Sequence, residues 1–275
     1  MTPAGARAAR QWAEALESWA IPDHILAAAP ESPWALPPSL FSVERRDPGP
    51  GSPTRTAAAA ALEEGGSVLD VGAGGGAASL PLAPPAGRVT AVDASAEMLD
   101  VFATAAADRG VAHRTVRGRW PDVAADVEPA DVVVCSHVVY NVADIVPFLD
   151  ELTDHARRRV VVELTAAHPL SPLNGLWRRF HGIERPNRPT ADDLVAVLHE
   201  LGVFPDVVRW TRPGRGPQRG AERALLVAIT RQRLCLTADR DPEVDEALGD
   251  EGDDPASVPR DVVTMWWPGR APVAG

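Results

Sequence analysis

The sequence predicts an α/β protein: a doubly wound, mostly parallel seven-stranded sheet, with an N-terminal helical extension and a C-terminal tail. One observation is a short apolar run, residues 67–71, that passes directly into four glycines within residues 72–76. Another is a second apolar run, residues 88–92, that ends in Asp93, about 20 residues after the glycine turn begins. A strand that opens into a glycine-rich turn is typical of the first βα unit of a nucleotide-binding sheet.

The helices and strands of the first half of the chain are predicted from the spacing of apolar residues and from Gly and Pro residues, which interrupt regular structure. Trp12, Leu16 and Trp19 fall on one face of a helix expected over residues 4–20, and a Pro-rich connector then runs to residue 53. The expected elements after it are a helix over 54–62, strand 67–71, helix 76–83, strand 88–92, helix 94–107, strand 112–117 and the fully apolar strand 131–136.

The second half continues the alternation of strands and helices. Thr190 followed by two acids predicts a helix start, and residues 231–256 are strongly acidic, which is typical of a solvated helix and loop. Residues 262–267 are too apolar to extend into solvent and are expected to pack back on the domain. The remaining expected elements are helix 143–158, strand 159–164, an insertion over 165–189, helix 190–202 and strands 203–211 and 224–230.

Composition and charge limit the functions that need to be considered. The net charge of −11 argues against nonspecific binding to nucleic acid, and no apolar stretch approaches the roughly 20 residues that span a bilayer. All 27 basic residues are Arg, so mechanisms that need a lysine are excluded. Cys135 and Cys235 lack metal-binding spacing. We therefore expect a cytoplasmic protein, monomeric or homodimeric, with no metal site and no membrane or nucleic-acid partner.

The glycine turn and the residues that follow it resemble a known family. Asp70-x-Gly72-x-Gly74-x-Gly76, with an acid closing the second strand and then Asp93-Ala94-Ser95-Ala96-Glu97-Met98, resembles motifs I and II of the class I S-adenosylmethionine-dependent methyltransferases. The resemblance runs from about residue 67 to 165. It implies S-adenosylmethionine as cofactor and methyl transfer to O or N of a small-molecule acceptor. The glycine spacing also fits a dinucleotide fingerprint, so an NAD(P)-dependent oxidoreductase is an alternative, as is a non-catalytic binding protein.

The resemblance also implies roles for single residues around the cofactor. Gly72 and Gly74 would lie against its amino-acid end, Asp93 would accept the ribose hydroxyls and Met98 would pack on the adenine. Downstream, Gly118-Arg119-Trp120-Pro121-Asp122 replaces the family's usual Gly-Asp-Ala. Either a backbone amide near Arg119 reads the adenine edge with Trp120 covering its face, or Asp122 substitutes; Trp120 can equally be a core aromatic. The complete predicted cofactor site is Asp70, Gly72, Gly74, Asp93, Ala94, Met98, Arg119, Trp120 and Ser136.

The residues after the fourth strand are the predicted reaction centre. Ligands of doubly wound sheets bind at the carboxyl ends of the strands, where the chain reads Ser136-His137-Val138-Val139-Tyr140-Asn141. His137 can act as a general base toward a hydroxyl or amine, with Tyr140 nearby; alternatively His137 only forms a wall of the pocket.

The insertion over residues 165–189 is the expected acceptor side. Its mixture of aromatic and basic residues suits an anionic or aromatic acceptor, and the predicted substrate residues are Asn141, His168, Trp177 and His181; the alternative is a surface helix with its aromatics packed inward. The predicted units are an N-terminal helical and Pro-rich cap (1–62), a methyltransferase domain (63–232) and an acidic tail with an apolar end (233–275).

Overall fold

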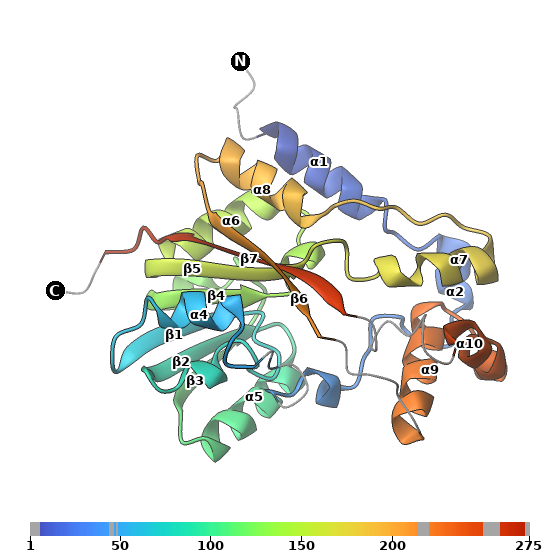
Figure 1. The fold of residues 1–275 in the computed structure, drawn as a ribbon, viewed down its shortest axis with the longest axis horizontal. Coiled ribbons are helices and arrows are strands. Elements are labelled where there is room, and N and C mark those ends of the chain that lie inside the picture. The colour runs from blue at the N-terminus through green and yellow to red at the C-terminus, as the bar shows by residue number, and fades with distance from the viewer. Residues whose placement is uncertain (1–5, 44–46, 48, 214–219, 250–258, 273–275) are drawn as a thin grey trace.

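A single seven-stranded sheet forms the centre of the protein (Figure 1). The computed structural model describes residues 6–43, 47, 49–213, 220–249 and 259–272. The sheet order is β3-β2-β1-β4-β5-β7-β6, and all neighbours are parallel except β7, which runs antiparallel to β5 and β6. This confirms the predicted sheet. The strands are β1 (Gly66–Val71), β2 (Ala86–Asp93), β3 (Ala112–Arg117), β4 (Ala130–Ser136), β5 (Ala156–Thr165), β6 (Asp206–Arg212) and β7 (Arg260–Pro268).

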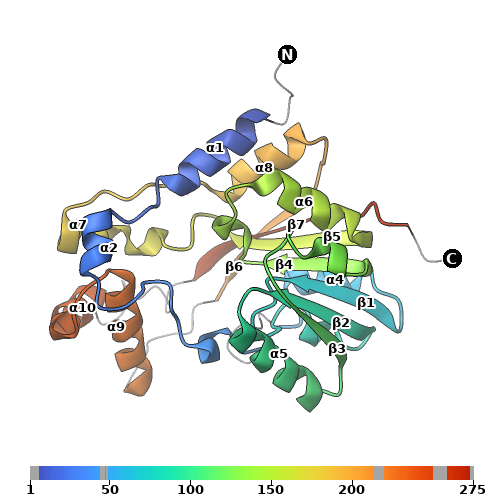
Figure 2. The same cartoon turned by 180° about the vertical axis from the view of Figure 1, so that it is seen from behind.

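Helices cover both faces of the sheet, because its central strands are apolar on both sides (Figure 2). On one face α1, α6 and α8 pack on alternate residues of the strands, such as Leu69 and Val133. On the other face α4 and α5 pack on the intervening residues, such as Val68 and Val132. These helices are α1 (Ala6–Glu17), α4 (Pro53–Ala59), α5 (Ala96–Asp108), α6 (Ile145–Asp154) and α8 (Ala191–Glu200).

A separate helical cluster lies beyond one end of the sheet, where both views show α2, α7, α9 and α10 gathered together (Figures 1 and 2). It has a small apolar core of its own, which includes Ile25, Trp177 and Leu248. We call these four helices the helical cap. They are α2 (Asp23–Ala28), α7 (Asn174–His181), α9 (Ala221–Arg233) and α10 (Asp241–Leu248), and short 3₁₀ turns at Pro38–Phe41, Leu80–Leu82, Ala124–Asp126, Val139–Asn141, Ser171–Leu173 and Ala238–Arg240 complete the described helical elements.

The last strand of the sheet is not where the sequence predicted it. Residues 224–230, expected as a strand, lie inside helix α9, and the strand between β5 and β6 is β7. A short apolar run fits a buried strand and a buried helix equally well, and in α9 the buried residues Val227, Thr230 and Arg231 recur at helical spacing. The expectation that residues 262–267 pack back on the domain is confirmed, since they lie within β7.

The helix expected over residues 76–83 is also wrong. The chain there forms turns and the 3₁₀ segment Leu80–Leu82, because Pro81, Pro84 and Pro85 lack the backbone donors of a longer helix. Residues 214–219, between two of the expected strands, and residues 250–258, in the acidic segment and the stretch after it, lie outside the described residues. The unit boundaries at 62/63 and 232/233 stay predictions. None of the described helices has the length and apolar character that a bilayer crossing needs.

Candidate functional site

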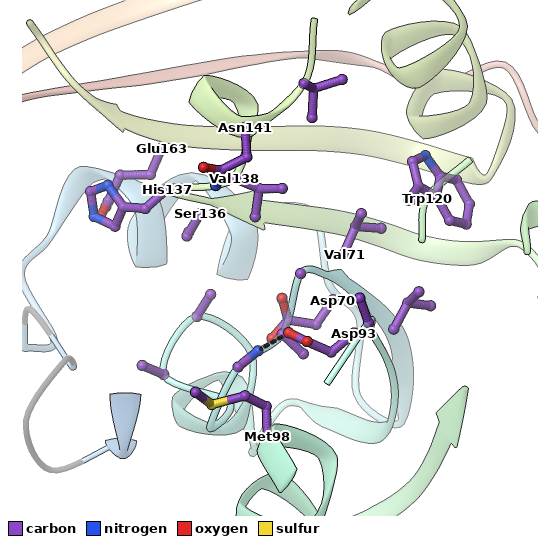
Figure 3. Close-up of a pocket in the computed structure, with 18 of the residues that line it drawn as sticks. Asp70, Val71, Asp93, Met98, Trp120, Ser136, His137, Val138, Asn141 and Glu163 are labelled. Atoms are coloured by element: carbon purple, nitrogen blue, oxygen red, sulfur yellow. Dashed lines mark hydrogen bonds and ion pairs between the residues drawn. The ribbon is translucent and has the colours of Figure 1, made fainter. Parts of the chain in front are cut away.

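A pocket of about 930 Å³ opens at the carboxyl ends of β1, β2, β4 and β5 (Figure 3). Its size falls within the range of small-molecule sites. In Figure 3, Asp70 and Asp93 lie together at the ends of β1 and β2, while His137 and Glu163 point toward each other on another side. Eleven of the residues singled out from the sequence line it: Asp70, Gly72, Gly74, Asp93, Ala94, Met98, Arg119, Trp120, Ser136, His137 and Asn141.

The glycine turn forms one wall of the pocket, and its backbone explains two of its glycines. Gly72 has φ +72°, and a Cβ there would overlap with Val138 Cγ2, on the segment that carries His137. A Cβ on Gly75 would overlap with the carbonyl oxygen of Phe41. The turn is therefore packed between the N-terminal segment and the loop after β4, so that backbone rather than side chains faces the pocket.

Replacing Gly72 with alanine is expected to destabilise the protein by about 2–4 kcal/mol, since strain at positive φ and overlap with Val138 add up. Gly110→Ala is the matched control, because Gly110 has φ +65° and no atom lies within 4 Å of the position that its Cβ would take. The measurement is urea denaturation of both variants. Equal losses of unfolding free energy would show that the contact with Val138 contributes nothing.

Asp93 stabilises the turn through two hydrogen bonds, and both of its carboxylate oxygens can still accept a hydrogen bond from a ligand. Its Oδ2 accepts a hydrogen bond from the Gly74 amide at 2.9 Å, and its Oδ1 accepts one from the Ser95 amide at 2.9 Å. An ionised carboxylate has about four lone-pair sites, so each oxygen can accept a further bond from a ligand hydroxyl. This arrangement fits a ribose with two neighbouring hydroxyls.

Asp70, at the end of β1, lines the same part of the pocket and is almost fully buried, with 1% of its surface exposed. Burial raises the pKa of Asp70 to about 7; the Ser79 hydroxyl, 2.5 Å from Oδ2, opposes this rise, and the charge of Asp93 adds to it. Among the described residues, no cationic side chain forms an ion pair with either acid. Two neighbouring carboxylates without a protein cation suit a ligand that carries positive charge, which is the case for an amino acid ammonium or a sulfonium.

The end of the pocket beyond β2 and β3 combines Met98, Arg119, Trp120 and Asp122. Trp120 is both a core residue and a pocket residue: its indole N–H donates to the Phe148 carbonyl at 3.3 Å, its ring meets His155 edge-on, and it still lines the cavity. Asp122 lines the cavity as well, so both interpretations of the adenine side are compatible with the structure.

His137 has an unusual backbone and a specific partner. Its φ is +59°, a conformation that non-glycine residues rarely adopt. Its amide donates to the Glu163 carbonyl oxygen at 2.7 Å, and its ring Nε2 lies 3.0 Å from Glu163 Oε1. The register of β4 and β5 pairs Ser136 with Glu163 and so brings the two side chains together. Backbone strain at a pocket is a pointer to function.

Glu163 is ionised although it is buried. Burial raises the pKa of Glu163, but the hydrogen bond and charge of His137, the Thr54 hydroxyl and the charge of Arg212 outweigh burial and hold this pKa below its usual value. Thr54 donates a very short hydrogen bond to Glu163 Oε2. The pocket thus contains a histidine whose ring is held by an ionised acid behind it, which is the arrangement of a general base and its orienting group.

Four predicted residues lie away from the pocket lining. Tyr140 is buried, stacks on Trp12 and donates its hydroxyl to the Thr165 carbonyl at 2.8 Å; burial raises the pKa of this phenol above its usual value. His168 is sandwiched between Trp19 and Tyr140, and burial, with the charge of Arg185, lowers the pKa of His168 to about 4. These two side chains fasten α1 and the insertion to the sheet.

Trp177 and His181 belong to the helical cap instead. The guanidinium of Arg185 lies 4.9 Å above the Trp177 ring, and His181 Nε2 lies 2.7 Å from the Leu234 carbonyl oxygen. Their aromatic and basic character thus serves contacts within the cap, and a molecule in the pocket would meet neither of them.

Thr54, Arg55 and Glu163 also line the pocket. From the sequence, Arg55 is a candidate for the roof of the site, and Glu163 either meets solvent or substrate or is buried against an Arg, whereas Thr54 was not predicted. Glu163 stands near the end of a predicted strand, which was the available signal. Thr54 and Arg55 belong to a short helix whose position over β5 and β7 depends on tertiary packing. The Arg55 guanidinium has no ion-pair partner among the residues described, so it is a half-buried cation that faces the cavity.

Comparisons with known proteins give matches to part of the chain. Residues 68–159 match the family model of a methyltransferase domain. A ubiquinone biosynthesis O-methyltransferase of Caulobacter vibrioides is 39% identical over 97 residues, 34% of this chain and 38% of that protein. An uncharacterized protein of Haemophilus influenzae is 33% identical over 139 residues, 50% of each chain. The chain therefore spans half or less of the length of the curated relatives it matches first.

Solved structures share the fold along most of the chain. The YcgJ protein of Bacillus subtilis superimposes with a TM-score of 0.53 at 18% identity, covering 79% of this chain and 98% of that chain. YjhP of Escherichia coli gives a TM-score of 0.53 at 15% identity, covering 84% of this chain and 98% of that chain. At such low identity the likeness concerns the fold alone.

Proposed function

We propose that this chain is a class I methyltransferase that transfers a methyl group from S-adenosylmethionine to an oxygen or nitrogen atom of a small molecule; the match of residues 68–159 and the sheet order support this. The observation that carries the proposal is that one pocket combines a glycine and carboxylate cradle with the His137–Glu163 pair. The cradle suits a positively charged nucleoside, and the pair suits removal of a proton.

In this proposal, different residues of the glycine and carboxylate cradle bind different parts of the cofactor. Asp93 accepts the ribose hydroxyls on the lone pairs that Gly74 and Ser95 leave free. Asp70 and Asp93 compensate the positive charge, and Arg55 is placed to pair with a carboxylate. When bound, S-adenosylmethionine supplies a methyl group already activated on a sulfonium, so the protein has mainly to align the acceptor and to remove its proton.

His137 performs the proton removal. A hydroxyl or an ammonium becomes nucleophilic when a base within hydrogen-bond reach takes its proton. His137 lines the cavity with a ring that is a third exposed, and Glu163 behind it stabilises the positive charge that the ring acquires. Tyr140, whose hydroxyl is bonded to a backbone carbonyl, has no part in this step.

The acceptor to try first is a phenol. Three of the relatives are named ubiquinone biosynthesis O-methyltransferases, although each match covers less than two fifths of the relative. A phenolic hydroxyl also has a proton that a histidine can take. Simple catechols and hydroxybenzoates, with aliphatic amines as the nitrogen series, therefore form the first acceptor panel.

Calorimetry with the purified protein tests the cofactor assignment before any acceptor is known. We expect binding of S-adenosylmethionine and S-adenosylhomocysteine and no binding of NADPH. The acceptor panel with methyl-labelled cofactor then tests for transfer. Binding of NADPH alone would favour an oxidoreductase, and binding of the sulfur compounds with no transfer to any acceptor would favour a non-catalytic binding protein.

Replacing Asp93 with alanine is expected to weaken S-adenosylhomocysteine binding about 10- to 100-fold, because hydrogen bonds to a charged acceptor contribute about 1.5–3 kcal/mol. The measurement is calorimetric titration, with the melting temperature recorded to verify folding. Asp100→Ala is the control, since Asp100 is an exposed acid on α5 away from the pocket lining. An unchanged dissociation constant in the Asp93 variant would remove the ribose contact from the proposal.

A further inference from the structure

A chain of side-chain hydrogen bonds runs from Trp210 on the edge strand β6 to His137. Trp210 Nε1 donates to Thr264 Oγ1 at 3.0 Å, and Thr264 Oγ1 lies 2.7 Å from Thr54 Oγ1. Thr54 contacts Glu163 Oε2, and Glu163 Oε1 lies 3.0 Å from His137 Nε2. The five residues come from β6, β7, α4, β5 and the end of β4. All but Trp210 and His137 are at least nine-tenths buried.

The direction of this chain is fixed by what each group can do. An indole N–H only donates, so Thr264 must accept from Trp210. Within the described part of the chain, the only acceptor within reach of the Thr264 hydroxyl proton is Thr54. Thr54 then has one acceptor left, Glu163 Oε2. Every hydroxyl is satisfied only when donation runs from Trp210 through Thr264 and Thr54 to Glu163.

Glu163 therefore ends the chain as an acceptor on both oxygens. Oε2 receives the Thr54 proton, and the low pKa of Glu163 leaves Oε1 without a proton of its own. The hydrogen atom between Oε1 and His137 Nε2 must then belong to the ring. A neutral imidazole carries one proton, so Nδ1 keeps its lone pair.

We propose that Glu163 and Thr54, supported by Thr264 and Trp210, hold His137 as the Nε2–H tautomer, so that Nδ1 is the atom that takes the acceptor's proton. Glu163 and Thr54 are positioning residues, since they act on the acceptor only through His137. This inference rests on the proposed function for its catalytic meaning, but the tautomer itself is a property of the unliganded protein.

The backbone adds a second constraint on the ring. The His137 amide is bonded to the Glu163 carbonyl oxygen at 2.7 Å, so both the main chain and the ring of His137 are tied to the same residue. No described residue forms a hydrogen bond with Nδ1, and the ring is a third exposed toward the cavity. These two contacts with Glu163 account for the retention of φ +59°, a backbone conformation that is unfavourable for a non-glycine residue.

The proton balance of the step is simple. The acceptor's hydroxyl proton moves to Nδ1, the oxygen keeps the electron pair of that bond, and the Nε2 proton stays in place. The ring becomes a cation directly beside ionised Glu163. No proton needs to travel along the threonine chain, whose hydroxyls keep the same donors and acceptors before and after the transfer.

Nitrogen NMR of the imidazole rings tests the tautomer in the absence of any acceptor. Long-range proton–nitrogen correlation spectra at alkaline pH distinguish the two neutral forms, and His137→Gln assigns the His137 signals by their loss. In the wild type we expect the Nε2–H form to exceed the Nδ1–H form by about tenfold or more, which corresponds to a hydrogen bond to a charged partner. Glu163→Gln should raise the Nδ1–H population at least several-fold.

Thr54 provides a matched pair of variants. Thr54→Ser keeps the hydroxyl and should keep the wild-type tautomer ratio, whereas Thr54→Val keeps the shape and removes the hydroxyl, so the ratio should shift toward that of Glu163→Gln. Once an acceptor is found, kcat should follow the same order with KM little changed. S-adenosylhomocysteine binding, measured in parallel, should be unchanged in both Thr54 variants.

The outcomes separate the inference from the proposed function. An Nδ1–H ring in the wild type, or a ratio that is identical in Thr54→Val and Thr54→Ser, overturns the positioning role even when the cofactor binds. The expected tautomer in a protein that binds no S-adenosylhomocysteine would support the positioning of His137 and overturn the methyl-transfer function instead.

Discussion

Replacing His137 with glutamine is expected to lower kcat for methyl transfer by about 10²- to 10⁴-fold, the usual contribution of a positioned general base. Glutamine is similar in length and can still donate to Glu163, but it cannot take a proton from the acceptor. The ribose is proposed to bind Asp93 at the end of β2, whereas His137 follows β4, so the affinity for S-adenosylhomocysteine should remain near that of the wild type. The measurement is kcat with a saturating phenolic acceptor, together with calorimetric titration of the product.

The control is His24→Gln, because His24 is exposed on α2 and lies away from the pocket lining. It should keep the wild-type kcat and melting temperature. A His137→Gln enzyme that retains most of its kcat would show that His137 is a wall of the pocket and that alignment of the acceptor is sufficient. A loss of cofactor affinity of the same size as the loss of kcat would mean that the substitution disturbed the glycine turn through Val138.

The glycine and carboxylate side of the pocket could be predicted because its residues are close together in the sequence. Asp70, Gly72, Gly74, Asp93 and Met98 fall within residues 70–98, from the end of β1 to the start of α5, where β1 pairs directly with β2. Their backbone requirements, a turn at positive φ and an acid at the end of the next strand, are visible as residue types. What the sequence could not indicate was that Gly72 is needed as much for Val138 as for a ligand.

The base half of the site depends on contacts between distant segments. His137 was found from its place after an apolar strand, but its partner required the register of β4 against β5, and Thr54 required the packing of α4 on β5 and β7. Neither contact leaves a local signal. The substrate residues predicted in the insertion lie away from the pocket lining for a related reason, since an aromatic and basic segment suits an acceptor pocket and the core of a helical cap equally well.

The free energy of unfolding is expected to depend strongly on pH because of Asp70. Its pKa rises from an ordinary 3.8 to about 7 in the folded state. Between these values the folded protein binds more protons than the unfolded chain, so the free energy of unfolding falls as pH rises from about 4 to 7. At 1.36 kcal/mol per unit, burial of the charged form costs up to about 4 kcal/mol above pH 7.

Asp70→Asn removes this ionisation while an amide oxygen remains to accept the bond from Ser79. Relative to the wild type, the variant should therefore gain about 2.5 kcal/mol more stability at pH 8 than at pH 5, because about two pH units of the shift fall between pH 5 and 7; the measurement is urea denaturation at both pH values. Because the other titrating groups contribute equally to the wild type and the variant, their contributions cancel in the difference between the two free energies of unfolding. Asp126→Asn, at an exposed acid, should give no such gain. Equal effects of Asp70→Asn at both pH values would show that Asp70 does not titrate between pH 5 and 8 in the folded protein.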